Sequence, residues 1–401
     1  MLTAVVLALL IGSAQEQSPV ASPRLEAERL ARDGQTHEAL ERYERIVSVD
    51  PADVEARIWI ARLLQRLGHT YLAEKEYRQA LAQAPNHVDA LVGLAVALNS
   101  RGATREASAF LDRAEQLAPE SADVLAARGQ SSKLSGHSTE AERYYARAHT
   151  LSPNDKDIEQ SFDQTRRINR NRVEGLFQYE MLTRATGAHT ADVAVDLRAD
   201  DRFRYNGRLQ VQTRASRSEA RAGGGVEWRA RPDLTVRGTV LVGPGAEIIA
   251  RTDVLAEIEH SRGRIDYAGG ARSVSFAGAD VWILSPQLTL WLNDRTALSG
   301  RYFASWTSFD DRPATLTHSG MGRLRYNIWP RLSLDIAYSR GYESIDTLTV
   351  ERLDSLRADT VSSGVVYHFR GIQSLAASVD IQRRSDDRTM IRFTAGVVHR
   401  F

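Results

Sequence analysis

Apolar and polar residues alternate one by one through most of the chain after residue 172. In 206–215, for example, Leu209 and Val211 fall on one side of an extended backbone, whereas Arg208 and Gln210 fall on the other. A period of two residues is typical of a β-strand with one apolar and one polar face. The pattern therefore predicts a domain of antiparallel strands. It returns in 220–230, 251–259 and 331–343.

The connections between these segments alternate between short and long. We predict fourteen strands, at 173–183, 190–199, 204–215, 219–230, 234–242, 250–260, 263–274, 280–293, 296–308, 315–328, 330–342, 359–370, 373–383 and 387–401. Short connections follow the even-numbered strands, at Asp200–Phe203, Arg231–Asp233, Ser261–Arg262, Asp294–Arg295, Trp329 and Gly371–Ile372. The longest connections follow odd-numbered strands, at Gly243–Ile249, Asp310–Ala314 and Tyr342–Asp359. This order is typical of a transmembrane β-barrel with short periplasmic turns and long outer loops. We expect a closed antiparallel barrel of about 14 strands over 172–401, with 12 or 16 strands as alternatives, and with both of its ends in the periplasm.

Between about residues 23 and 153 the period becomes helical, and the sequence repeats itself every 34 residues. The recurring positions are Gly34, Gly68, Gly102 and Gly136; Ala39, Ala73, Ala107 and Ala141; Tyr43, Tyr77, Leu111 and Tyr145; and Pro51, Pro85, Pro119 and Pro153. They resemble the tetratricopeptide repeat, in which alanine lets two helices approach, the aromatic fills the gap to the next helix, glycine turns between helices and proline ends the second. The resemblance implies an all-α solenoid of four repeats over 23–153, whose concave surface binds a protein partner. The named residues are expected to serve packing and turns rather than ligand contacts.

Two segments flank the repeats. At the start, Leu2–Gly12 is an apolar run, and Ser13 and Ala14 follow it. The run is too short for a spanning helix but has the length of the apolar core of a secretory signal, although no Lys or Arg follows Met1. We expect a signal peptide at 1–14, a flexible lead-in at 15–22, and a capping helix with a linker at 154–171.

The composition excludes several kinds of functional site. The chain has a net charge of +1 and no cysteine, so it forms no disulfide or thiolate metal site and has no basic excess for nucleic acid. The sequence contains no nucleophile elbow, zinc motif, phosphate loop or dinucleotide fingerprint. We expect a protein that is not an enzyme, with no catalytic residue, metal or cofactor. An enzyme whose Ser, His and acidic side chains meet from separate strands stays open as an alternative.

The polar faces of the predicted strands point into the barrel. Their charges either hold the interior open and in register through salt bridges, or line a pore that hydrogen-bonds a passing polymer. The candidate pore-lining residues are Arg208, Arg214, Arg221, Glu227, Arg229, Arg237, Glu257, Glu259, Asp266, Arg272, Arg301, Arg323, Arg325, Asp335 and Arg392. The aromatics expected to face lipid are Phe177, Tyr179, Tyr205, Trp228, Tyr302, Trp306, Tyr338 and Phe369.

The last predicted strand has an apolar face that ends on an aromatic residue. Phe393, Val397 and Phe401 share this face. The ending resembles the assembly signal of bacterial outer-membrane proteins, so the resemblance implies the barrel-assembly machinery as a partner and outer-membrane lipid as the surroundings.

A predicted signal, a helical repeat array and a terminal barrel together resemble the YaiO family of outer-membrane proteins. The resemblance includes the strand end Tyr338-Ser339-Arg340-Gly341-Tyr342-Glu343 and the terminal Phe401. The architecture is also similar to that of exopolysaccharide exporters, although those carry longer repeat arrays and larger barrels. It implies a barrel that exports a polysaccharide, with the repeats docking a periplasmic protein. The alternative is an interaction scaffold with a closed barrel as its anchor.

Overall fold

The computed structural model describes residues 22–183, 185–341, 358–369, 373–385 and 387–401. The predicted signal peptide at 1–14, residues 15–21 of the lead-in, most of the Tyr342–Asp359 connection and the Gly371–Ile372 turn lie outside the described residues. The chain divides into two compact units. The first takes in the chain up to Leu134 together with Tyr144–Pro153, and the second takes in Ser135–Arg143 and Asn154–Phe401.

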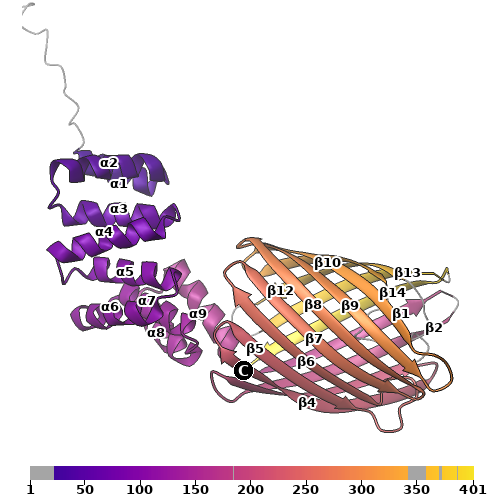
Figure 1. Ribbon diagram of the computed structural model, residues 1–401. Coiled ribbons are helices and arrows are strands. Elements are labelled where there is room, and N and C mark those ends of the chain that lie inside the picture. The colour runs from indigo at the N-terminus through magenta and orange to yellow at the C-terminus, as the bar shows by residue number, and fades with distance from the viewer. Residues whose placement is uncertain (1–21, 184, 342–357, 370–372, 386) are drawn as a thin grey trace, which may run out of the picture. The chain divides into compact units, whose positions relative to one another are not determined.

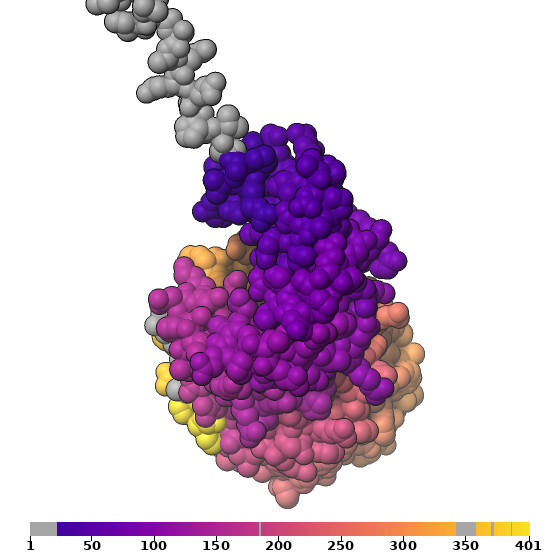
Figure 2. Space-filling model, turned by 90° about the vertical axis from the view of Figure 1, so that its left-hand side faces the viewer, coloured from indigo at the N-terminus to yellow at the C-terminus, as the bar shows by residue number. Residues whose placement is uncertain are grey.

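Nine helices occupy the described residues before the barrel, and consecutive helices stack in antiparallel pairs (Figure 1). They are α1 (Pro23–Arg32), α2 (Thr36–Val49), α3 (Val54–Arg66), α4 (Thr70–Gln83), α5 (Val88–Ser100), α6 (Thr104–Leu117), α7 (Ala122–Leu134), α8 (Ser138–Leu151) and α9 (Lys156–Asn169). The predicted all-α repeat array is confirmed. In the space-filling view the stacked pairs of the first unit form one continuous surface (Figure 2).

The helical pairs are held together by a core of small and large apolar residues. Ala39 and Leu111 are fully buried, and Tyr43 stacks on the indole of Trp59 with ring centroids 5.6 Å apart. Tyr77 is 1% exposed, and its ring lies against Gly93, where a Cβ atom would come within 2.3 Å of the ring. At this contact the array therefore depends on a small residue opposite a large one.

The second unit is built on a closed barrel of fourteen antiparallel strands in which each strand pairs with its neighbours along the chain. They are β1 (Arg172–Leu182), β2 (Ala185–Arg198), β3 (Phe203–Arg214), β4 (Arg217–Arg231), β5 (Leu234–Val242), β6 (Thr252–Arg262), β7 (Ile265–Phe276), β8 (Ala279–Asn293), β9 (Thr296–Phe309), β10 (Thr315–Trp329), β11 (Leu332–Gly341), β12 (Ala358–His368), β13 (Gln373–Arg384) and β14 (Thr389–Arg400). The strands are tilted to the barrel axis (Figure 1). The predicted fold class and strand number are confirmed.

Several predicted strand ends are wrong, and three of them lie at turns. Ser261 and Arg262 belong to β6, and the turn lies two residues later, where Gly263 has a φ of 63°. Trp329 still belongs to β10. Ala215, predicted inside a strand, has a φ of 49° and forms a turn with Ser216. Alternation alone does not show where a strand stops, because a turn residue can continue the pattern.

The outer face of the barrel is apolar. Leu209, Ile258, Leu298, Ile336 and Ile381 are between 45% and 52% exposed, and they come from five different strands. Such a surface is compatible with an outer-membrane protein, because apolar side chains in this amount are stable against lipid rather than water.

Among the described residues, no helix has both the length and the apolar character needed to cross a membrane.

The barrel closes between its first and last strands. β1 pairs with β14 over eleven positions, from Arg172 opposite Arg400 to Leu182 opposite Met390. One residue beyond, Asn171 and Phe401 exchange two backbone hydrogen bonds of 3.1 and 3.0 Å. No backbone edge is left open at this seam, as a sheet in lipid requires.

Candidate functional site

Side chains from the inner faces of β2 and β3 form the first part of an ion-pair network in the lumen. The Nε atom of Arg208 lies 2.9 Å from both carboxylate oxygens of Asp192, and Gln210 Nε2 donates to the same carboxylate at 2.9 Å. Asp192 is buried, so its charge requires these partners. The two strands are thereby joined inside the barrel as well as through their backbones.

The network continues through β4 to β7. Arg221 donates to Gln210 Oε1 at 2.7 Å and to Asp253 Oδ2 at 2.9 Å. Arg272 donates to both oxygens of Asp253, at 2.8 and 2.7 Å. Asp253 therefore joins arginines of β4 and β7, strands that are not neighbours.

Two further groups of ion pairs use the same inner face. Arg237 of β5 contacts Glu227 of β4 and Glu259 of β6, each at 2.9 Å. Arg301 of β9 reaches Glu257 of β6 at 3.2 Å, across two intervening strands. The second contact helps to fix the curvature of this side of the barrel, because it bridges strands that have no shared hydrogen-bond ladder.

The closing strands carry a buried cluster of their own. The guanidinium of Arg392 on β14 lies 2.8 Å from Glu180 of β1 and 3.6 Å from Asp380 of β13. Arg392 and Glu180 are 4% and 2% exposed. Because a buried charge without a partner is strongly destabilising, this cluster ties the seam together.

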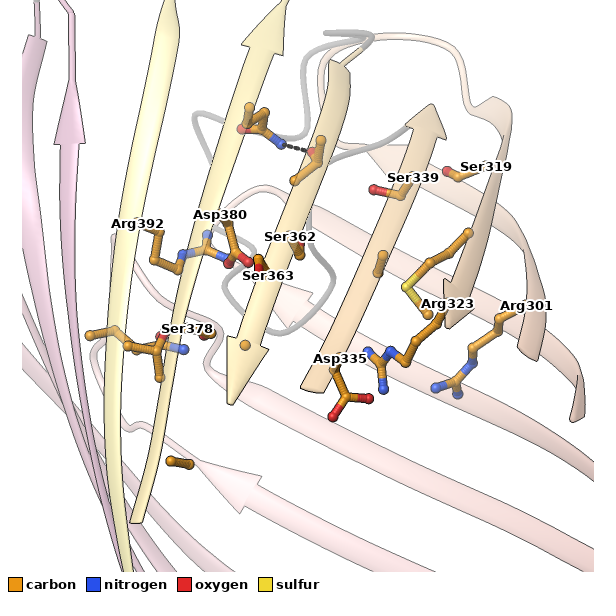
Figure 3. Close-up of a pocket in the computed structure, with 18 of the residues that line it drawn as sticks. Arg301, Ser319, Arg323, Asp335, Ser339, Ser362, Ser363, Ser378, Asp380 and Arg392 are labelled. Atoms are coloured by element: carbon orange, nitrogen blue, oxygen red, sulfur yellow. Dashed lines mark hydrogen bonds and ion pairs between the residues drawn. The ribbon is translucent and has the colours of Figure 1, made fainter. Parts of the chain in front are cut away.

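A cavity of about 520 Å³ lies in the lumen beside these groups (Figure 3). Most of the residues that line it come from β8 to β14, with a few from β1, β6 and β7. In the figure Arg301, Arg323 and Asp335 lie together on one side, and Arg392 and Asp380 lie on the other. Serines of β10 to β13 lie in the same wall.

Part of the inner face is apolar, which corrects the expectation of a wholly polar lumen. Val274 and Phe276 of β7 pack against Val281 and Ile283 of β8, and Ala250 completes the cluster. All five are at most 4% exposed. Ala250 lies in the connection from β5 to β6, so this connection folds against the inner wall of the barrel.

Glu219 of β4 holds the same connection in place. Its carboxylate accepts hydrogen bonds from the backbone N–H groups of Glu247, Ile248 and Ile249 at 3.0, 2.8 and 3.0 Å. Arg217 adds an ion pair to Glu247 at 2.6 Å. Three convergent donors on one carboxylate make this predicted outer loop an ordered element.

At the opposite end of the barrel, arginines of β2 and β3 hold the end of α9. Arg204 donates to the carbonyl oxygens of Ile168 and Arg170, and Arg198 donates to that of Asn169 at 3.5 Å. The last carbonyls of a helix have no partner within the helix and carry partial negative charge, so arginines there are stabilising.

Asp201, in the turn between β2 and β3, caps the start of α8. It accepts hydrogen bonds from the backbone N–H of Thr139 at 3.1 Å and from the hydroxyl groups of Thr139 and Ser138 at 2.9 and 3.1 Å. Burial opposes ionisation of Asp201, but these bonds and the charge of Arg198 outweigh it and lower the pKa of the carboxyl group. The start of α8 and this turn thus form a single polar cluster.

Most of the predicted pore-lining residues make ion pairs. Asp266 accepts a hydrogen bond from the indole of Trp291 at 2.7 Å, and Arg214 is buried. Within the described part of the chain, Arg229 and Arg323 have no ion-pair partner. The others make ion pairs: Arg208, Arg221, Glu227, Arg237, Glu257, Glu259, Arg272, Arg301, Arg325, Asp335 and Arg392.

The predicted repeat residues lie at the helix contacts and turns. Ala73, Ala107 and Ala141 are fully buried, and Tyr145 is 4% exposed. The glycines that follow the first helix of each pair, Gly34, Gly68, Gly102 and Gly136, have φ values of 81°, 83°, 80° and 85°. The prolines lie two residues beyond α2, α4, α6 and α8, at Pro51, Pro85, Pro119 and Pro153.

The predicted assembly residues lie on the outer face. Phe393, Val397 and Phe401 are 44%, 47% and 48% exposed.

Three carboxylates of these clusters were not predicted from the sequence. They are Asp253, which lies on the same face of its strand as Glu257 and Glu259, and Glu219 and Asp201. No pattern marks a carboxylate that binds backbone N–H groups far away in the sequence. In the ranges that the structure covers, no group of three or more His, Cys, Asp or Glu side chains is placed to hold a metal.

Comparison with known proteins identifies tetratricopeptide repeats in the helical part. Three family models, each described as a tetratricopeptide repeat, match residues 24–69, 54–87 and 72–130. No curated protein matches the chain.

Similar solved structures also cover about a third of the chain. A thermophilic tetratricopeptide repeat protein from Thermus thermophilus is 25% identical, with 36% of this chain and 79% of that chain covered and a TM-score of 0.34. MamA from Desulfovibrio magneticus is 20% identical, with 36% and 82% covered and a TM-score of 0.32. PilF from Pseudomonas aeruginosa is 23% identical, with 36% and 65% covered and a TM-score of 0.33.

Proposed function

We propose that this chain is an outer-membrane scaffold, in which the barrel is anchored in lipid and the helical repeats bind a protein partner in the periplasm. Tetratricopeptide repeats generally mediate contacts between proteins, because stacked helix pairs present one extended surface. The observation that carries the proposal is the apolar outer face of the closed barrel. A repeat array joined to such a barrel is tethered to a membrane. The proposal assigns the chain no catalytic step.

The membrane part is tested by one substitution at two exposed leucines. Leu298 on β9 and Leu117 on α6 are 49% and 44% exposed. A lipid-facing arginine destabilises an outer-membrane barrel by about 2–4 kcal/mol near the bilayer centre, whereas a water-facing one is nearly neutral. Leu298→Arg is therefore expected to reduce the heat-modifiable, folded form in outer-membrane fractions, and Leu117→Arg to leave it unchanged. Equal effects of the two variants would count against a lipid-facing barrel.

The scaffold part is tested by photo-crosslinking in cells. Exposed positions of the repeats, such as Tyr71, are replaced one at a time by a photoreactive residue in the full chain. A partner that uses one face of the array should give a discrete adduct from neighbouring positions on that face only. Absence of adducts from every face of a folded, membrane-inserted chain would contradict the proposal.

A second candidate function is passage of a polysaccharide through the barrel. The cavity of about 520 Å³ favours it, because the β8–β14 side of the lumen keeps open space with charged and hydroxyl side chains in its wall. The test is conductance of the full chain in a planar bilayer. Steady conductance that an added oligosaccharide blocks would support passage, whereas a correctly inserted but silent barrel would exclude it and leave the scaffold.

A further inference from the structure

The wall of the lumen cavity carries more positive than negative charge. It contains five arginines but three acidic residues. All three acids already have an arginine partner, so their charges are compensated within the wall. The pairs are Glu257 with Arg301 at 3.2 Å, Asp335 with Arg325 at 3.0 Å, and Asp380 with Arg392 at 3.6 Å.

Arg323 differs from the other arginines of this wall because it has no ion-pair partner among the described residues. It lies on β10 with its side chain at the cavity, and among the described residues it makes no hydrogen bond or ion pair. The nearby carboxylate of Asp335 is bound by Arg325 instead. A guanidinium group offers a planar set of donors that matches a carboxylate, so Arg323 provides a ready anion contact.

The rest of the polar wall consists of groups that both donate and accept hydrogen bonds. Hydroxyl and amide side chains line it from β1 and from β8 to β13, and several of them are visible around the cavity (Figure 3). Such groups bind sugar hydroxyls, which also both donate and accept. They include Gln178, Ser285, Ser319, Ser339, Ser362 and Ser378.

We infer that this cavity binds an acidic oligosaccharide, with a sugar carboxylate on Arg323 and sugar hydroxyls on the surrounding serines. The inference rests on the second candidate function and names the class of polysaccharide. A neutral glycan would leave the charge of Arg323 without a partner. A single inorganic anion would fill little of about 520 Å³, a volume within the range of about 300–1,000 Å³ typical of organic ligand sites.

The experiment measures binding by calorimetry with the full chain refolded in detergent. The probes are tetragalacturonate and maltotetraose, an acidic and a neutral tetrasaccharide. Wild type is expected to bind tetragalacturonate at least tenfold more tightly than maltotetraose. Arg323→Gln is expected to weaken tetragalacturonate binding at least tenfold, and Arg323→Lys, which keeps the charge but loses the planar donor set, to weaken it less.

The matched control is Arg295→Gln. Arg295 is exposed in the turn between β8 and β9, outside the cavity, so this variant removes the same charge from elsewhere. Its affinity should stay within twofold of wild type. The inference is overturned if folded wild type binds neither probe, if both probes bind equally, or if Arg323→Gln has no larger effect than Arg295→Gln.

Calorimetry and conductance distinguish a failure of oligosaccharide binding from a failure of transport through the barrel. A barrel that binds tetragalacturonate through Arg323 but never conducts keeps the site and loses the transport function. A barrel that conducts but is blocked equally by both tetrasaccharides keeps transport and loses the acidic specificity.

Discussion

The two units of this chain bury opposite kinds of side chains. In the helical unit the large apolar residues, such as Leu111 and Tyr77, lie at the helix contacts and are at most 1% exposed. In the barrel, leucines such as Leu298 face outward, while Glu180 and Arg392 are buried inside. This difference is expected if water surrounds the helical unit and lipid surrounds the barrel, because the surrounding solvent decides which face of an element is polar.

In the barrel, each buried charge needs a partner of opposite charge. In the helical unit, the buried apolar side chains instead need to fill the space between the helices. Glu180 and Asp253 both lie where a lost partner cannot be replaced by water. Tyr77 and Gly93 instead fit by shape.

The barrel should be most sensitive where a side chain added to a glycine would come closest to the backbone of the neighbouring strand. A Cβ atom on Gly223 of β4 would lie 1.9 Å from the carbonyl oxygen of Val240 on β5. Gly223→Ala should therefore break the β4–β5 ladder, cost about 3 kcal/mol or more, and abolish the heat-modifiable form. The matched control is Gly207→Ala on β3, because nothing lies within 4 Å of a Cβ atom there. Equal loss in both variants would mean that glycine is needed for another reason.

Breaking a buried ion pair should cost nearly as much. Glu180→Ala removes the nearest carboxylate from the buried Arg392, whereas Asp380 lies farther from it, and we expect a loss of about 3–5 kcal/mol in urea unfolding of the barrel. Asp335→Ala removes one partner of a pair whose Arg325 side chain is 46% exposed, and should cost less than about 1 kcal/mol. Similar losses from the two variants would show that water reaches both sites.

The same leucine substitution should act differently in the two units. Leu111→Ala opens a cavity in the helical core and should destabilise that unit by about 2–5 kcal/mol in thermal unfolding followed by the helical circular dichroism signal. Leu298→Ala only shortens a side chain on the outer face of the barrel, and should cost about 1 kcal/mol. A large loss from Leu298→Ala would place its side chain in a packed interface.

High pH should weaken the helical unit. Burial raises the pKa of Tyr77 to about 12 from an ordinary value of 10.0. The unfolded chain loses this proton first, so the contribution of Tyr77 is complete below pH 10.0 and is lost as the pH rises to about 12. The loss is about 2–3 kcal/mol at about 1.4 kcal/mol per pH unit.

Tyr77→Phe should remove this part of the pH dependence of the helical signal, because phenylalanine has no proton to lose. The same change also removes the hydrogen bond from Tyr77 to Gln65, so the variant is compared with itself at neutral pH. Tyr71→Phe is the control, since Tyr71 is 69% exposed. An unchanged pH profile for Tyr77→Phe would show that another group controls the alkaline transition.

The sequence was sufficient for the architecture because both periods are local. Alternation places Arg208 and Gln210 on one face whatever the rest of the chain does, and a 34-residue spacing aligns Gly34 with Gly68. The contacts inside the lumen could not be predicted in this way. Arg301 reaches Glu257 only because the barrel curves, and curvature depends on all fourteen strands.

The apolar cluster and the capping turn escaped prediction for different reasons. Phe276 and Val281 continue strands whose other face is also partly apolar, so the pattern does not show which face is inside. Asp201 is 62 residues from Thr139 in the sequence, and an isolated aspartate in a turn usually bonds to its own backbone.

Because the barrel closes between β1 and β14, it can form only after the last strand has been synthesised. β1 is the first strand of the barrel, and it pairs with β2 on one side and with the last strand, β14, on the other. The pairing with β14 extends to Asn171 and Phe401. A ribosome that stops before residue 389 would release a chain with finished helical repeats but with β1 and β13 as open edges. Such edges pair readily with other strands, so an incomplete chain exposes a surface that degradation machinery can recognise.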